Sequence, residues 1–229
     1  MRIWDINPGY LNRQSLLGEH RELHGIVSII LNQNKGYSNH PETRRWIGYG
    51  WALKKRHDLL SCEMALRGYT DKSPVKTSSN KGNWPTRFVD DPGIQFQLLE
   101  KKYRRKEKGR IPLPKNEQVL WSHHKYSVLA RDQNKYNEIG RAVSKQEIGF
   151  HTLSLLLVEI LRIQPGNGGI RNAIQHMWGY VSEINEQNRR NVESWSLQQL
   201  LYATQKITME ANEPYITKST ALSELMAWI

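Results

Sequence analysis

Two carboxylates occupy positions where a helix pattern calls for apolar side chains, close to the start of the chain. Apolar residues recur at three- and four-residue steps over residues 13–31, which predicts an amphipathic helix. On that helix Glu19 falls within the apolar arc, Glu22 falls on its flank and Arg21 points away. A half-buried carboxylate is costly unless it is paired or used. An ion pair is one explanation of this pattern, and a catalytic acid or base is the other.

A second reactive group is the amino group of Met1. A turn containing Asn7-Pro8-Gly9 separates the chain start from the predicted helix. α-Amino groups ordinarily have a pKa of about 7.7–8.0, against about 10.4 for lysine. Such an amine is a usable nucleophile near neutral pH. Because Arg2 is bulky, we expect Met1 to be retained as the first residue.

The chain start has a specific order and spacing of residues: Arg2-Ile3, Gln14, Leu16, Glu19 and then Arg21-Glu22-Leu23. A further segment, residues 53–69, reads LKKRHDLLSCEMALRGY. Together they resemble the pyrimidine-dimer DNA glycosylase family of the phage endonuclease V type. The likeness covers roughly the first 70 residues and fades after them.

The resemblance implies a reaction and two catalytic residues. In that family the α-amino group of the chain attacks the sugar C1′ at the damaged base and forms an imine, and the key carboxylate aligns with Glu22. Met1 is then the expected nucleophile and Glu22 the expected acid and base of a glycosylase with abasic-site lyase activity on pyrimidine dimers. No cofactor is required. A family histidine is Ser15 here and a family DNA-binding arginine is Gly25, so the preferred lesion can differ.

Charge divides the chain into a basic part and a near-neutral part. The net charge is +11; residues 1–112 hold 21 Lys and Arg against 11 Asp and Glu, and residues 113–229 hold 12 against 11. This asymmetry predicts that the first part faces a polyanion. The resemblance implies that this polyanion is double-stranded DNA containing pyrimidine lesions. The expected DNA-binding residues are Arg2, Gln14, Arg21, Arg44, Arg45, Lys54, Lys55, Lys81, Trp84 and Arg87.

Each of these residues has an alternative role. Any single cation could lie on a solvated helix face. Trp84 could stack where a base leaves the duplex, or it could anchor its loop to the core. The dense basic run over residues 101–110 could bind the DNA backbone or serve as a linker.

Turn signals and apolar spacing predict an all-α protein of two helical domains. The endonuclease V-like domain, residues 1–112, has a second helical segment over 41–66 with a break at Gly48–Gly50, and then a long irregular loop over 70–93. Ile111-Pro112-Leu113-Pro114 marks the boundary. In the second part, residues 120–143, 172–180 and 214–228 are similar to a bacterial helical domain of unknown function, a resemblance that spans nearly all of residues 113–229. This part is expected to form a bundle, with helices over 116–131, 133–145, 147–163, 170–186, 189–211 and 218–229.

Other features narrow the class of protein. The chain has one cysteine, no apolar leader and no apolar stretch of bilayer length, which predicts a cytoplasmic, nucleoid-associated protein with no membrane partner. His20 and His24 do not follow the zinc-protease order, so no metal site is predicted there. The alternative function is a non-catalytic nucleic-acid-binding protein whose second domain binds a protein partner or acts on a modified base.

Overall fold

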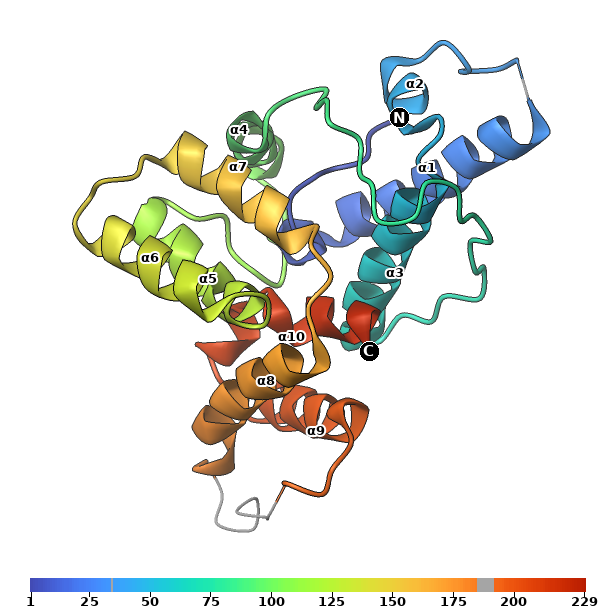
Figure 1. Ribbon diagram of the computed structural model, residues 1–229. Helices are drawn as coiled ribbons and strands as arrows, with labels where there is room; N and C mark the ends of the chain where they lie inside the picture. The colour runs from blue at the N-terminus through green and yellow to red at the C-terminus, as the bar shows by residue number, and fades with distance from the viewer. Residues whose placement is uncertain (34, 185–191) are drawn as a thin grey trace.

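The computed structural model describes residues 1–33, 35–184 and 192–229, and over these residues the chain forms helices and no strand. This confirms the all-α prediction (Figure 1). The first part begins with the short 3₁₀ turn η1 (Pro8–Tyr10). It continues with α1 (Arg13–Asn32), α2 (Pro41–Trp46), α3 (Gly50–Leu66) and α4 (Pro92–Tyr103).

The second part is a series of helices over its described residues. Its elements are α5 (Glu117–Leu129), α6 (Gln133–Ser144), α7 (Phe150–Leu161), α8 (Asn167–Ser182), α9 (Leu197–Glu210), η3 (Ile216–Lys218), α10 (Ala221–Glu224) and η4 (Leu225–Trp228).

Local signals explain where several helices begin and end. The side chain of Asn12 caps α1 by accepting from the Ser15 N–H. Gly48 has φ +85°, a left-handed conformation that suits glycine, and it produces the predicted break between α2 and α3. The predicted start of the helix over 189–211 was wrong. Ser196 and Gln199 form a capping box, which starts α9 at Leu197, and residues 189–191 lie outside the described part of the chain.

The helices pack through two hydrophobic clusters. α1 packs against α3, α4 against α7, and α5 against α6, α7 and α8, while α10 and η4 dock on α3 (Figure 1). One cluster takes buried residues from Ile3 through to Ile160, and the other takes them from Tyr126 through to Trp228. The first cluster therefore crosses the predicted boundary at residue 112, and the division into two folding units stays a prediction. No helix in the described ranges combines the length and apolar character needed to cross a membrane.

The segment after α4 returns across the chain start. The Ile111 N–H donates to the Gly9 carbonyl at 2.9 Å, and the Ile111 side chain is fully buried. Gly109 lies so close to the first turn that a Cβ atom there would be 2.5 Å from the Tyr10 carbonyl oxygen. Glycine is therefore the residue that lets this linker between α4 and α5 pass the first turn.

A buried ion cluster around Glu63 of α3 joins the first turn, the linker and the C-terminal segment. The fully buried Glu63 carboxylate accepts from Arg67 Nε at 2.7 Å and from Arg110 Nη2 at 2.7 Å. Arg67 also donates to the Leu11 carbonyl at 2.7 Å. Arg110 donates to the carbonyls of Thr217 and Ser219. Burial alone would raise the pKa of Glu63, but Arg110 and Arg67 outweigh it and lower the pKa to about 2.

We expect Glu63→Gln to destabilise the protein at pH 7 by about 3 kcal/mol, because the substitution removes a carboxylate whose pKa is depressed by the fold. The contribution is fully present above the ordinary carboxyl pKa of about 4.5 and is lost as the pH falls toward 2. The difference between the two proteins should therefore shrink over that range. Urea unfolding at pH 7, 5, 4 and 3 measures it.

Glu138→Gln is the matched control, since Glu138 is 64 % exposed in its pair with Lys135. Exposed pairs of this kind contribute about 0–1 kcal/mol. A Glu63→Gln deficit that stays constant between pH 7 and pH 3 would contradict the assignment of the acid sensitivity to this carboxylate.

Candidate active site at the chain start

The first seven residues form no helix, and their backbone N–H groups are bound by side chains of α1 and α4. The Arg2 N–H donates to the Glu22 carboxylate. Next, the Trp4 N–H donates to Glu19 Oε1 at 3.2 Å and the Asp5 N–H to Gln95 Oε1 at 2.8 Å. A segment with neither helix nor sheet partners must satisfy its buried N–H groups in some other way. These side-chain acceptors supply the missing partners and fix the path of the chain start.

Glu42 of α2 also accepts a hydrogen bond from the backbone of this segment. The Ile3 N–H bonds to its carboxyl group, and the indole nitrogen of Trp46 donates to it at 3.0 Å. Burial raises the pKa of Glu42, and Arg45 together with these hydrogen bonds offsets part of that effect. Ile3 and Trp4 are buried, so their side chains anchor the segment from the apolar side.

The geometry brings the Met1 amine and Glu22 into one neighbourhood. The amine is separated from the Arg2 nitrogen by three covalent bonds, so its distance from the Glu22 carboxylate oxygen that Arg2 binds is at most about 6 Å. Within the described residues, the amine takes part in no ion pair, and Glu22 pairs with no arginine or lysine side chain. Glu22 is half-buried and Arg21 is exposed, as the helix pattern predicted. The Met1 side chain packs against the core.

Glu19 has a structural partner. Its carboxylate forms a two-pronged pair with Arg56 of α3, with Nε–Oε1 at 2.7 Å and Nη2–Oε2 at 2.9 Å, and both side chains are buried. Arg56 also donates to the Ile6 carbonyl at 2.9 Å. Burial raises the pKa of Glu19 to about 7 against the opposing effect of Arg56. For Glu19 the ion-pair explanation therefore holds, which leaves Glu22 as the carboxylate beside the amine.

Arg45 does not lie at the surface as a phosphate-binding residue would. Its guanidinium is 5 % exposed and pairs with Asp5 and Glu42. Asp5 is also bound by Arg162 at 2.7 Å and by Gln95 Nε2 at 2.8 Å. Arg45 thus belongs to an internal charge cluster, because its two carboxylate partners lie next to it in the fold.

Two other expected DNA-binding residues also face inward. Lys55 donates to the Ala227 carbonyl at 2.6 Å and lies over the Trp228 ring, where it holds the C-terminal segment on α3. Trp84 is half-buried, donates to the Arg162 carbonyl at 3.0 Å and packs edge-on against Trp51. Trp84 therefore takes the anchoring role rather than the exposed stacking role.

Arg2 and Lys54 keep part of their charge at the surface. The Arg2 side chain pairs with Asp90 at 2.6 Å and lies over the Trp4 ring. Lys54 is 46 % exposed and pairs with Asp58 on the same helix. Pairs this exposed are weak, so a phosphate could compete for either cation.

The remaining expected residues are exposed, and they fall on two surfaces. Gln14 and Arg21 line a groove of α1 together with Arg13 and Lys106. Arg44 and Arg87 line a hollow of about 490 Å³ between α2 and the loop before α4, beside Tyr49 and Phe88. Lys81 is exposed on the same loop.

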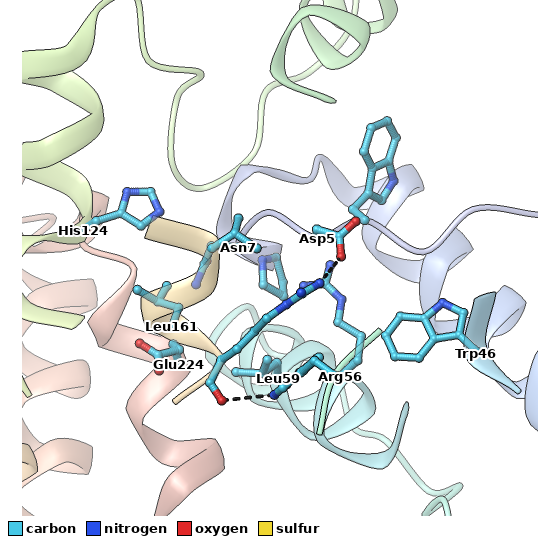
Figure 2. Close-up of a pocket in the computed structure, with 13 residues that line it drawn as sticks. Asp5, Asn7, Trp46, Arg56, Leu59, His124, Leu161 and Glu224 are labelled. Carbon is cyan, nitrogen blue, oxygen red and sulfur yellow. Dashed lines mark hydrogen bonds and ion pairs between the residues drawn. The ribbon is translucent and has the colours of Figure 1, made fainter. Parts of the chain in front are cut away.

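A small cavity of about 40 Å³ lies where the two parts of the chain meet. Figure 2 shows side chains from both parts around it: Asp5, Asn7, Trp46, Arg56 and Leu59 from the first, and His124, Leu161 and Glu224 from the second. Glu224 is itself paired with Arg131 at 2.6 Å. The cavity has room for a few water molecules and none for a nucleotide, so it is part of the interface between the parts.

The sequence pattern did not reveal the residues that position the chain start from outside α1. Glu42 lies 20 residues after Glu22 in the chain, and Gln95 lies further still. Nothing in their local spacing signals a contact with residues 3 and 5. The available signal was weak: each is a polar residue on the buried side of a short helix.

Comparison with known families gives two matches, in different parts of the chain. Residues 125–224 match the family model described as a protein of unknown function (DUF1722). Neither the curated proteins nor the solved structures gave a match. Residues 1–77, which contain Met1, Glu22 and the helices that hold them, match the family model of pyrimidine dimer DNA glycosylase, so both resemblances found in the sequence are confirmed.

Proposed function

We propose that this protein is a DNA glycosylase with abasic-site lyase activity that acts on pyrimidine lesions in double-stranded DNA. The proposal assigns the nucleophile to the Met1 amine and the acid and base to Glu22. It rests on one observation above the others: the backbone N–H of Arg2 binds the Glu22 carboxylate, which fixes the amine and the acid in one neighbourhood. The match of residues 1–77 to pyrimidine dimer DNA glycosylases supports the class of reaction.

The proposed reaction uses this geometry in two stages. The Met1 amine attacks the sugar C1′, the bond from C1′ to the base breaks, and the departing base takes up a proton. Opening of the sugar ring, with Glu22 supplying a proton to the ring oxygen, leaves an imine between the amine and C1′. Glu22 then accepts the C2′ proton, and the 3′-phosphate leaves by elimination. Hydrolysis of the imine by water releases the sugar fragment and restores the amine.

The position of Glu22 suits a group that must give and take protons. Its carboxylate is half-buried and is held from one side by the Arg2 N–H, so it is oriented before a substrate arrives. In contrast, Glu19 is sealed in its pair with Arg56 and has no access to a substrate. The two carboxylates one turn apart on α1 therefore have different roles.

The exposed cations supply the expected DNA contacts. Arg44 and Arg87 border one hollow, and Arg21 and Gln14 border a groove on α1. Phosphate contacts from such residues supply most of the affinity for a duplex and fix its register, while the target nucleotide is rotated out of the stack. A DNA substrate would also place the protein at the nucleoid.

A non-catalytic nucleic-acid-binding protein is the rival proposal, with residues 113–229 recruiting a protein partner. It shares the DNA-binding surfaces but assigns no chemistry to Met1. In that case Glu22 serves only to hold the Arg2 N–H.

Borohydride trapping separates the two proposals. Untagged protein is incubated with a duplex carrying one thymine dimer, or one abasic site, and then reduced. We expect a covalent protein–DNA adduct that peptide mapping assigns to residue 1, because reduction converts the imine into a stable amine. Protein extended by two residues before Met1 is the control and should give no adduct. Binding of both duplexes without any adduct would favour the non-catalytic rival.

Glu22→Gln should lower strand cleavage at an abasic site by about 100-fold or more, the range typical of a lost general acid or base. Glutamine keeps the oxygen that accepts the Arg2 N–H, so the chain start should stay in place and DNA affinity should change less than about twofold. Glu100→Gln, an exposed substitution on α4, is the matched control. Cleavage at the wild-type rate by Glu22→Gln would remove this residue from the mechanism.

The double substitution Arg44→Gln and Arg87→Gln should weaken duplex binding and reduce its salt dependence. Each lost phosphate contact lowers the slope of log K against log salt by about 0.9, so we expect a change of about 2. Fluorescence anisotropy at several salt concentrations measures the slope. Lys145→Gln with Lys206→Gln, both exposed in the second part, is the charge-matched control. An unchanged slope in the arginine variant would place the DNA on another surface.

A further inference from the structure

Four side chains that can bind a metal ion converge between α1 and α3. His20 and His24 lie one turn apart on the same face of α1, as the i, i+4 spacing requires. His57 comes from α3 and Asp71 from the segment that follows it. One ligand atom from each of the four residues lies within 4.8 Å of all the others. The fold thus assembles a ligand set that His20 and His24 alone do not reveal.

The distances within the cluster fit a tetrahedral ion. The three imidazole rings have centroids 4.7, 5.0 and 5.0 Å apart. Asp71 carboxylate oxygens lie 3.2 Å from His20 Nε2 and 3.3 Å from His57 Nε2. Zinc bonds to nitrogen and oxygen of about 2.0–2.1 Å give a ligand–ligand edge of about 3.3 Å in a tetrahedron. The 3.2 Å contact is made by Asp71 Oδ1 and the 3.3 Å contact by Oδ2, so whichever oxygen binds the ion already has one edge of that length, and modest side-chain movement would complete the others.

The Nε2 atoms of all three histidines are buried and have no hydrogen-bond partner within the described chain. Two of these nitrogens, those of His20 and His57, lie within 3.3 Å of Asp71 oxygens. Buried polar atoms without a hydrogen bond are unfavourable, and one bound cation would satisfy all three nitrogens.

Neighbouring residues outside the cluster contact two of its ligands, Asp71 and His57. The Ser61 hydroxyl donates to Asp71 Oδ2 at 3.1 Å, and the Ser73 N–H donates to Asp71 Oδ1 at 2.9 Å. Asp58 lies 4.0 Å from His57 Nδ1, on the side of the ring away from the cluster centre. Carboxylates and hydroxyls in such positions typically fix the orientation of metal ligands.

We propose that His20, His24, His57 and Asp71 form a tetrahedral site for a zinc ion. Three imidazole nitrogens and one carboxylate are ligands that zinc accepts, and four protein ligands leave no open position, which is the arrangement of a structural site. The ion joins α1 to α3 and to the start of the irregular segment before α4. It thereby fixes the helix that also carries Glu22, without taking part in the chemistry at the chain start.

Metal binding can be measured without DNA, so its outcome is independent of the proposed repair activity. Untagged protein stripped with a chelator is titrated with Zn²⁺ against a competing chromophoric chelator. We expect one ion per chain, a dissociation constant below about 1 µM at pH 7.5, and a higher melting temperature with zinc. Co²⁺ bound in the same place should give the visible absorption of a tetrahedral complex.

His24→Ala and Asp71→Ala should each weaken Zn²⁺ binding by about 100-fold or more and remove the thermal stabilisation. Both residues are partly exposed, so these variants should fold without zinc. His151→Ala is the matched control, because His151 is a surface histidine that also lies beside an aspartate, Asp91. Zinc binding weaker than about 1 µM in the wild-type protein, or unchanged affinity in His24→Ala and Asp71→Ala, would overturn the proposal.

Discussion

The structure depends on how the buried backbone of the chain start is hydrogen-bonded. Residues 2–5 belong to neither a helix nor a sheet, yet Ile3 and Trp4 are buried, so their N–H groups need acceptors. Each N–H group has its own acceptor: Glu22 for Arg2, Glu42 for Ile3, Glu19 for Trp4 and Gln95 for Asp5. Carboxylates bind N–H groups more strongly than neutral acceptors do, and burial of these acids is tolerated because each has such a partner. The same bonds that hold the segment place the first amine beside Glu22.

The linker and the second part of the chain also bind the elements that hold the chain start. Arg162, which follows α7, binds Asp5, and Arg110 of the linker binds both Glu63 and the carbonyls of the C-terminal segment. Lys55 holds η4 on α3. Removing one partner of a buried pair leaves an uncompensated charge, so these contacts penalise separation of the two parts. The glycosylase-like segment, residues 1–77, is therefore supported by residues that lie outside its family match.

The sequence predicted those features that depend on local spacing. The apolar period of α1 correctly placed Glu19 inside, Glu22 at the edge and Arg21 outside, and glycine located the break between α2 and α3. It could not predict which cations turn inward. Arg45 and Lys55 resemble Arg44 and Lys54 in type and neighbourhood, but their partners, Asp5 and the Ala227 carbonyl, are 40 and 172 residues away. The same limit applies to His57 and Asp71, whose relation to His20 appears only when α1 and α3 pack together.

α1 carries its reactive groups on two different faces. Glu19 and Glu22 are three residues apart and share a face, while His20 and His24 are four apart and share another, roughly 100–160° around the helix from the first. The first face binds the chain start and, through Glu19, Arg56 of α3, while the second places its histidines against His57 of α3. Because a helix turns as a rigid body, rotation that improved one face would disturb the other. The position of Glu22 beside the amine is therefore set on both sides of α1, by the hydrogen bonds of the chain start and by the packing of the histidines against α3.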